Sequence, residues 1–209
     1  KTVVVLGNAR SGTSMTSGLL SILGVNMNPV DNPSDQNPKG SFEDKDFIGI
    51  TTKMHQDLKA GKTRTQISEA WTPELKSLIG TKSGLWGFKS GLTHFHLDTI
   101  HPLLEDPHYV VVARNLVNNA RSFVIHQRDN YRNHVSLEDA LINMADSAQI
   151  LCRCLVNINS PRHYICYEDI KKDSVMEITR LADFLQVRIT QEQRKEAAEF
   201  ILAEYSTLE

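Results

Sequence analysis

The 209-residue sequence has few cysteines, no long apolar run and no strong excess of one charge. The longest uninterrupted apolar run, Tyr109–Ala113, is far shorter than the roughly 20 residues that span a bilayer. The three cysteines, Cys152, Cys154 and Cys166, lack zinc-site spacing, and their odd number argues against a disulfide framework. The formal charge of −2 gives no general attraction to nucleic acid or to an anionic membrane. We therefore expect a cytoplasmic protein with no nucleic-acid or membrane partner, in which any anion site is local.

Glycine is absent from the second half of the chain, because all eleven glycines lie between Gly7 and Gly91. Loops carry binding and catalytic residues more often than regular elements do, so we expect function to lie early in the sequence. Residues 25–42 contain three prolines and many Asn, Asp and Ser residues, while residues 59–70 are polar and basic. Both segments are predicted to be mobile loops of the kind that binds substrates. The length favours a single domain over residues 1–209.

Short β-branched runs alternate with helical patterns along the chain. The predicted strands are Thr2–Leu6, Leu85–Phe88, Tyr109–Ala113 and Tyr164–Tyr167. The predicted helices are Gly12–Leu23, Glu43–Leu58, a segment capped by Thr72 with Pro73, Thr93–Leu104, Asn118–Asn130 and a long helix capped by Ser136. Strands separated by helices indicate an α/β fold with a parallel sheet flanked by helices on both faces. Ligands of such sheets bind at the carboxyl ends of the strands.

The strongest motif is the segment Gly7–Ser14, which lies between the first predicted strand and the first predicted helix. It has the G-x4-G frame of a P-loop, in which backbone N–H groups and a helix N-terminus surround a phosphate. The lysine of nucleotide-hydrolysing P-loops is replaced by Thr13, and the cation of the loop is Arg10. The strand that could supply a magnesium-binding Asp ends instead in Arg114. We therefore predict a P-loop-type sheet whose loop binds an anionic donor without a metal. The alternative is that this loop is a strand-to-helix turn that binds no ligand.

The residues of this loop resemble a motif of the sulfotransferases that use 3′-phosphoadenosine 5′-phosphosulfate (PAPS). That family's loop reads [RK]-S-G-[TS]-[TS], and its second motif is a strand-end Arg followed eight residues later by a Ser that grips the 3′-phosphate. Arg114 and Ser122 have this spacing. The resemblance implies a 5′-phosphosulfate loop made of Ala9, Arg10, Ser11, Gly12, Thr13 and Ser14.

Three shorter segments extend the resemblance along the chain. Residues 37–43 (NPKGSFE) are similar to an N-P-K-G-x-[FW]-E segment of bacterial-type members. Lys89 is similar to the family's strand-end lysine, and Tyr167 to the tyrosine near the adenine. Two features of the animal cytosolic members are missing: Lys89 is followed by Ser90 and Gly91 rather than by the catalytic histidine, and no basic R-K-G-x-x-G segment closes the sequence.

The resemblance implies transfer of a sulfuryl group from PAPS to a hydroxyl or amine of a small-molecule or glycan acceptor, with 3′-phosphoadenosine 5′-phosphate (PAP) as product and no metal. Arg10 and Lys89 are expected to stabilise the transferred group, although Lys89 could equally be a surface lysine. Glu43 is the favoured general base, with a plain helix-start role as its alternative. His94 and His96 are rival bases, of which at most one can face the site.

Two other functions remain open from the sequence. A P-loop kinase of small molecules shares the fold and size, but the missing lysine and strand-end Asp count against it. A nucleotide-binding relative without catalysis is the other alternative, because no single base is compelling. The acceptor and the oligomeric state are not encoded in any recognisable motif. We expect residues 25–42 and 59–70 to shape the acceptor side.

Overall fold

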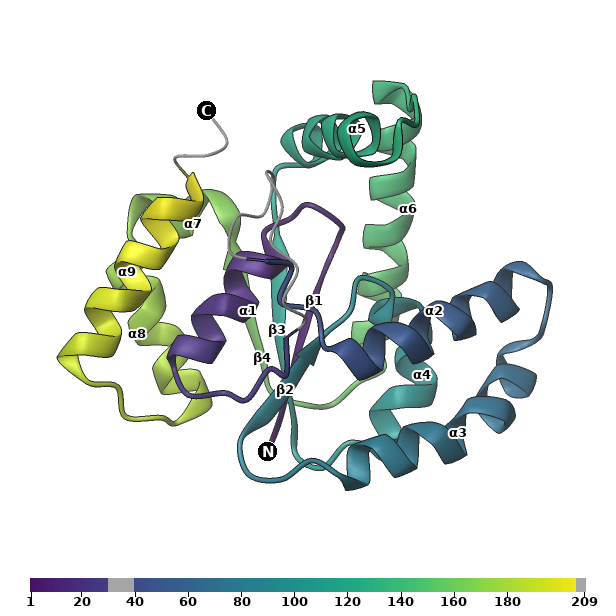
Figure 1. The fold of residues 1–209 in the computed structure, drawn as a ribbon, viewed down its shortest axis with the longest axis horizontal. Coiled ribbons are helices and arrows are strands. Elements are labelled where there is room, and N and C mark those ends of the chain that lie inside the picture. The colour runs from purple at the N-terminus through teal and green to yellow at the C-terminus, as the bar shows by residue number, and fades with distance from the viewer. Residues whose placement is uncertain (30–39, 206–209) are drawn as a thin grey trace.

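The computed structural model describes residues 1–29 and 40–205 as a parallel sheet between two layers of helices (Figure 1). The strands are β1 (Thr2–Gly7), β2 (Trp86–Lys89), β3 (Pro107–Ala113) and β4 (Arg162–Cys166), in the spatial order β2-β1-β3-β4. All neighbouring strands are parallel, so their carboxyl ends meet at one edge of the sheet. The expected α/β fold with a parallel sheet is confirmed.

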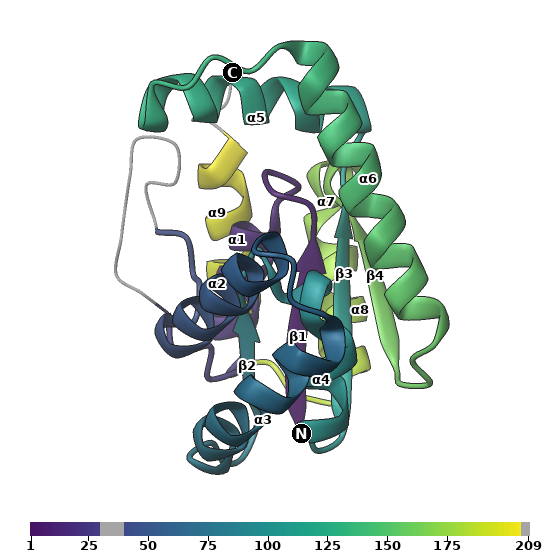
Figure 2. The same cartoon turned by 90° about the vertical axis from the view of Figure 1, so that its right-hand side faces the viewer.

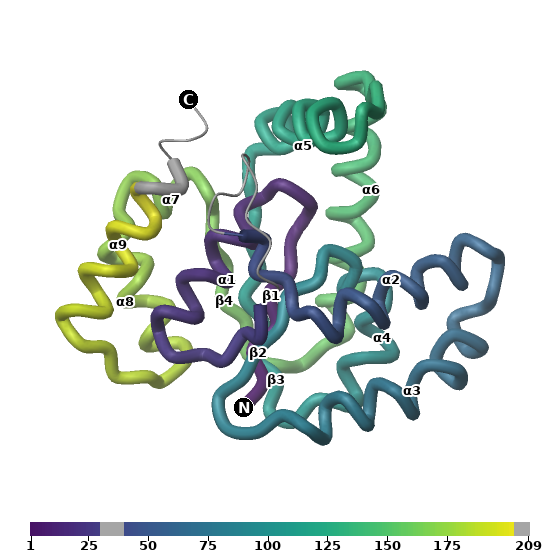
Figure 3. Tube along the Cα trace, viewed as in Figure 1, coloured from purple at the N-terminus to yellow at the C-terminus, as the bar shows by residue number. Residues whose placement is uncertain are grey.

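One face of the sheet is covered by α1 (Thr13–Ile22), α8 (Ser174–Leu185) and α9 (Gln191–Tyr205). Val3 and Val5 of β1 point to this face, because side chains alternate along a strand. They form an apolar cluster with the inner residues of these helices. Figure 3 follows the trace from β1 through the glycine-containing loop into α1, which lies beside α9.

The opposite face is covered by α2 (Lys45–Lys59), α3 (Arg64–Gly80), α4 (Leu97–Ile100) and α6 (Leu137–Val156). Val4 and Leu6 of β1 pack into this second cluster. Both faces of the central strands are therefore buried, which explains why their sequences are continuously apolar rather than alternating.

The helix α5 (Leu116–Tyr131) follows β3 and extends across the carboxyl edge of the sheet (Figure 2). Its N-cap is Asn115, whose side chain accepts hydrogen bonds from the backbone N–H groups of Val117 and Asn118. The helix then packs against α6. This placement puts one side of α5 close to the loops that follow the strands.

The predicted loop over residues 59–70 is wrong in most of its length. The helix α3 already begins at Arg64, because Thr63 and Gln66 form a capping box. Thr72 is consequently not a helix cap, and Pro73 lies inside α3. Of the other predicted loop, residues 25–42, the part from 30 to 39 lies outside the described residues.

Two smaller differences concern local structure. The predicted helix Thr93–Leu104 is broken into a 3-10 turn at Thr93–His96, the short helix α4 and a second 3-10 turn that contains Pro102. The last strand ends at Cys166, and Tyr167 begins the short helix α7 (Tyr167–Lys172). None of the helices in the described part of the chain combines the length and the apolar character that crossing a bilayer requires.

Candidate active site at the carboxyl edge of the sheet

The loop between β1 and α1 has the backbone of an anion-binding site. Arg10 has a φ of 65° and Gly12 a φ of 102°, so the chain twice enters the left-handed region within three residues. The Ser11 N–H donates to the Asn8 carbonyl at 3.1 Å and closes the turn. The loop leads directly into the N-terminus of α1, where backbone N–H groups lack helical partners. Such an arrangement binds phosphate or sulfate groups.

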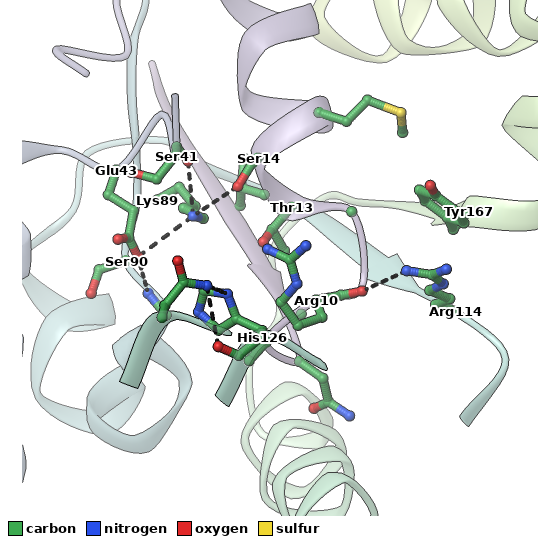
Figure 4. Close-up of a pocket in the computed structure, with 18 of the residues that line it drawn as sticks. Arg10, Thr13, Ser14, Ser41, Glu43, Lys89, Ser90, Arg114, His126 and Tyr167 are labelled. Atoms are coloured by element: carbon green, nitrogen blue, oxygen red, sulfur yellow. Dashed lines mark hydrogen bonds and ion pairs between the residues drawn. The ribbon is translucent and has the colours of Figure 1, made fainter. Parts of the chain in front are cut away.

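A cavity of about 440 Å³ opens beside this loop and joins residues from all four strand ends (Figure 4). Its lining includes Ala9, Arg10, Gly12, Thr13 and Ser14 from the loop, Ser41, Glu43, Lys89, Ser90 and Gly91 beside β2, Arg114 after β3, and Tyr167 after β4. The parallel sheet thus brings together most of the site residues that the sequence predicts. Ser11 is buried beneath the loop and does not line this cavity.

Lys89, the last residue of β2, supplies the ammonium group that the loop itself lacks. Its Nζ donates to the Ser14 hydroxyl at 3.3 Å and to the Ser41 carbonyl at 2.9 Å. The residue is only 6% exposed, so it is not a surface lysine. Burial lowers the pKa of the Lys89 ammonium, and the nearby Glu43 carboxylate opposes that shift. Lys89 therefore holds a desolvated cation at the mouth of the anion-binding loop.

Glu43 faces Lys89 across the cavity, with its Oε1 3.5 Å from the Lys89 Nζ. The same Oε1 accepts a hydrogen bond from the Gly91 N–H at 3.1 Å. The position of Glu43 is fixed by the next residue, since the Asp44 N–H donates to the Lys89 carbonyl at 3.0 Å. The Gly91 N–H and Lys89 thus hold the Glu43 carboxylate in the cavity, where it could accept a proton from a bound molecule.

Arg114 lies on the other side of the loop, beside Tyr167. Its Nη1 donates to the Arg10 carbonyl at 3.1 Å, and its guanidinium carbon lies 4.3 Å from the centre of the Tyr167 ring. The Arg114 Nε is buried and has no hydrogen-bond partner among the described residues. This cation and aromatic ring form a second polar region of the same cavity (Figure 4).

Ser122, which the sequence predicts at the 3′-phosphate, contacts the side chain of Arg10. Its hydroxyl lies 3.4 Å from the Arg10 Nε, and it does not line the cavity. Asn119, one turn earlier on α5, donates to the Ala9 carbonyl at 2.5 Å. The start of α5 therefore holds the glycine-containing loop from the side, a role that the spacing from Arg114 did not reveal.

His94 lies outside the cavity. Its Nε2 lies 2.9 Å from the Ser147 hydroxyl on α6, and burial lowers the pKa of its imidazole to about 4. His96 is also buried and has a pKa lowered to about 4, mainly by burial. The structure therefore brings neither rival base to the anion-binding loop. In the described part of the chain, no three His, Cys, Asp or Glu side chains group as metal ligands would.

Three lining residues near the end of α5 were not predicted: His126, Asn130 and Tyr131. Their sequence carries no phosphate-binding signal, and only the path of α5 across the sheet edge brings them to the cavity. The spacing of four residues from Ser122 to His126 and from there to Asn130 is the one pattern that could have indicated a shared helix face.

The assembled site combines a loop of N–H groups, three cations and one carboxylate. Arg10, Lys89 and Arg114 surround one cavity, and Glu43 is the acidic residue among those drawn in Figure 4. Lys89 contacts this loop at Ser14, and Arg114 contacts it at the Arg10 carbonyl. The two cationic regions therefore adjoin the same loop. Such a site fits a ligand with two separate anionic groups, and it offers a proton acceptor next to one of them.

Several solved structures with a similar fold are sulfotransferases. Sulfotransferase STF9 from Mycobacterium avium aligns with a TM-score of 0.67 and 15% identity, over 96% of this chain and 67% of that chain. Mouse sulfotransferase SULT7A1 complexed with PAP aligns with a TM-score of 0.59 and 15% identity, over 98% of this chain and 66% of the mouse chain. A sulfotransferase from Alicyclobacillus acidocaldarius aligns with a TM-score of 0.53 and 14% identity, over 99% of this chain and 93% of that one.

These similarities show a shared fold, and this chain spans about two thirds of the length of the first two structures. No curated protein sequence matches the chain. The sulfotransferase domain family, however, matches residues 1–208, which is nearly the whole sequence. The chain therefore belongs to the sulfotransferase family, whose members move a sulfuryl group from PAPS to an acceptor.

Proposed function

We propose that the cavity at the carboxyl edge of the sheet binds PAPS and that the protein transfers its sulfuryl group to a hydroxyl or amine of a small-molecule acceptor. The single observation that carries this proposal is that one cavity contains the glycine-containing loop, the Lys89–Glu43 pair and Arg114. The fit rests on the donor set. Among the described residues that line the cavity, backbone N–H groups and cations, which bind anions, outnumber the one carboxylate, that of Glu43.

The 5′-phosphosulfate is assigned to the loop. Arg10 and the N–H groups of Gly12, Thr13 and Ser14 would hold it, with the N-terminus of α1 behind them. The N–H of Ser11, which the sequence also predicts here, instead donates to the Asn8 carbonyl. Lys89 would contact the same group from the strand-end side, since its Nζ already lies 3.3 Å from the Ser14 hydroxyl. These groups stabilise the negative charge that develops on the phosphate as the sulfuryl group leaves.

The 3′-phosphate is assigned to Arg114, whose Nε lacks a partner among the described residues. Tyr167, against which the Arg114 guanidinium rests, would lie near the adenine. Ser122 is assigned a supporting part in the same binding site, because its hydroxyl holds the Arg10 side chain. The two phosphate sites would then be linked through Arg10, whose carbonyl accepts from Arg114.

Glu43 is assigned as the general base. The reaction breaks the bond between sulfur and the phosphate oxygen, whose electron pair stays on PAP, and forms a bond from sulfur to the acceptor oxygen or nitrogen. Glu43 would take the proton that the acceptor loses, and the Gly91 N–H and Lys89 hold its carboxylate in place. His94 is not assigned this role, because its ring is directed at Ser147 on α6.

The other functions considered from the sequence differ in their predicted ligands. The family assignment decides against a small-molecule kinase, which would require magnesium and ATP. A relative that binds PAPS without catalysis would lack turnover with every acceptor in a panel of phenols, alcohols, amines and glycans. We propose an intact enzyme, because the Lys89–Glu43 pair is assembled beside the loop.

The decisive experiment is a thermal-shift titration with PAP, with AMP and with ATP plus magnesium. We expect stabilisation by PAP and little by the other two ligands, because only PAP occupies both anion sites. Arg114→Ala should weaken PAP binding roughly tenfold or more, the effect of losing a hydrogen bond to a charged group.

The matched control is Arg180→Ala, which removes an exposed arginine on α8. It should leave PAP binding unchanged. Preferential stabilisation by magnesium-ATP, or equal PAP affinity of the Arg114 and Arg180 variants, would contradict the proposed function.

A further inference from the structure

Phe42, the residue before Glu43, has a backbone conformation that bulky residues rarely adopt. Its φ of 50° lies in the left-handed region, where the Cβ of any residue other than glycine crowds a neighbouring carbonyl oxygen. Such a conformation persists only where the surrounding structure holds it, and it is common at functional sites. The contacts that hold Phe42 therefore bear on where the Glu43 side chain is directed.

Lys89 binds the chain on both sides of the Phe42–Glu43 pair. Its Nζ donates to the Ser41 carbonyl at 2.9 Å, and its own carbonyl accepts from the Asp44 N–H at 3.0 Å. Figure 4 shows Ser41, Glu43 and Lys89 together at one side of the cavity. The two residues between these contacts have different surroundings, since Glu43 lines the cavity and Phe42 packs against the apolar cluster that includes α1 and α9.

The Phe42 ring occupies a space that a glycine leaves open. Its centroid lies 5.9 Å from that of the Phe200 ring on α9, and the ring planes meet at 82°, the edge-to-face arrangement that aromatic pairs favour. A Cβ on Gly18, within α1, would lie 3.0 Å from the Phe42 Cζ and 2.3 Å from the Phe200 Cζ. Glycine destabilises a helix interior relative to alanine, so the room that the two rings need accounts for its presence here.

We propose that Phe42 is a positioning residue for Glu43: its ring, held between α1 and α9, keeps the left-handed turn that directs the Glu43 carboxylate to the Gly91 N–H and to Lys89. The inference rests on the proposed function, in which Glu43 is the general base. It makes the packing of α1 against α9 part of what places that base in the cavity.

The kinetic test is a double-mutant cycle on sulfuryl transfer from ³⁵S-labelled PAPS to the best acceptor of the phenol, alcohol, amine and glycan panel. Phe42→Ala should lower kcat roughly tenfold or more, because the base is misplaced, and should change PAP affinity less than about twofold. The loss should disappear in the Glu43→Gln background, because a residue that acts through Glu43 has no effect once the base is gone. Phe42→Leu, which keeps an apolar side chain between α1 and α9, should restore most of kcat.

A second measurement needs no acceptor, because the Gly91 N–H donates to the Glu43 carboxylate at 3.1 Å. Loss of this hydrogen bond changes the chemical shift of the Gly91 amide proton, and Glu43→Gln gives the position of the signal without the carboxylate. Phe42→Ala should move the Gly91 signal at least half of the way to that position, whereas Phe42→Leu should leave it near its original place.

Phe184→Ala is the matched control for the loss of an aromatic ring. Phe184 is a partly buried residue of the same apolar cluster, and its ring contacts those of His108 and His163. The variant should be less stable than the unchanged protein, but its kcat and its Gly91 signal should not change.

Gly18→Ala tests the same link from α1. Its Cβ should displace the two rings without changing any residue that lines the cavity, so kcat should fall as it does in Phe42→Ala. Gly49→Ala, on α2, is the control for this substitution, because a Cβ there would meet no atom within 4 Å. It should leave kcat unchanged.

Equal losses of kcat in Phe42→Ala and Phe184→Ala, or a further loss when Phe42→Ala is added to Glu43→Gln, would overturn the inference. A Gly91 signal that stays in place in Phe42→Ala would also overturn it. Failure of the unchanged protein to bind PAP, or to transfer the sulfuryl group to any acceptor of the panel, would instead overturn the proposed function.

Discussion

Gly12 occupies a position that no other residue type fits. Its φ of 102° lies in the left-handed region, and a Cβ at this position would be 2.6 Å from the Tyr167 Cδ2. Gly61, in the turn between α2 and α3, also has a positive φ, of 85°, but a Cβ there would meet no atom within 4 Å. Comparing substitutions at the two glycines therefore distinguishes the cost of the left-handed backbone conformation from the cost of the contact with Tyr167.

We expect Gly61→Ala to lower the free energy of unfolding by about 1 kcal/mol, the cost of the left-handed conformation alone. Gly12→Ala should lower it by roughly 3 kcal/mol, because the clash with Tyr167 is added. It should also abolish PAP binding, since the loop must move. Urea unfolding and PAP titration of both variants measure these effects. Similar free energies of unfolding for the two variants would show that the loop accommodates a Cβ at residue 12 and would contradict the clash with Tyr167.

Among the elements, α2 has the most direct influence on the site, because its N-terminus follows Glu43. Its N-cap, Asp44, is completely buried. The Asp44 Oδ1 accepts from the N–H groups of Asp46 and Phe47 at 2.9 Å, and its Oδ2 lies 3.5 Å from the Lys82 Nζ. Asp44 thus combines a helix cap with a buried ion pair, and its backbone ties Glu43 to the end of β2.

Asp44→Ala should lower the free energy of unfolding by roughly 3 kcal/mol, because it removes a cap and leaves Lys82 with the more exposed of its two carboxylate partners, Asp46. Sulfuryl transfer to any hydroxyl or amine accepted in the panel should also fall, because α2 begins directly after Glu43 and loses the side-chain cap that fixes its first turn. Thr63→Ala removes the exposed cap of α3 and should cost about 1 kcal/mol with turnover unchanged. Chemical denaturation and turnover assays compare the two, and equal effects on turnover would contradict the link between Asp44 and the site.

At the scale of the whole molecule, both apolar clusters share the central strands. Val3 and Val5 belong to one cluster, and Val4 and Leu6 to the other. Neither layer of helices can separate from the sheet without exposing one face of β1. We therefore propose that residues 1–209 form one domain that unfolds as a unit.

Two buried histidines in the 3-10 turn after β2, His94 and His96, make this unfolding sensitive to acid. The pKa values of His94 and His96 are about 4 in the folded protein and 6.5 ordinarily, so the unfolded chain binds protons first as the pH falls. The free energy of unfolding should therefore decrease as the pH falls from 6.5 toward 4. His55 and Arg64 disfavour protonation of His96, whereas Asp98 favours it.

Urea unfolding at several values between pH 7 and pH 5, followed by tryptophan fluorescence and circular dichroism, measures this loss. The two signals should change together if the chain is one domain. His94→Gln, which keeps a hydrogen-bonding group near Ser147, should reduce the pH dependence, and His134→Gln on the surface should not. A stability that is constant over this range would contradict the neutral state of both buried rings.

The sequence predicts the parts of the fold that depend on local patterns. The apolar runs of β1 and β3 and the glycine spacing of the loop are short-range features, so their elements are confirmed. The capping box of Thr63 and Gln66 is equally local, but the polar and basic composition around it is more typical of a loop. Pro73 after Thr72 is typical of a helix start, although α3 accommodates this proline in its interior.

Local sequence patterns are enough to assign the family, the parallel sheet and the placement of Arg10, Lys89 and Arg114 at strand ends, because parallel strands direct their carboxyl ends to one edge. Which side chains meet across that edge depends on how the helices pack over the sheet. The crossing of α5 pairs Ser122 with Arg10 and brings His126 into the cavity, while burial against α6 removes His94 from it. These contacts join residues far apart in the chain, and no local pattern encodes the packing of one helix over another.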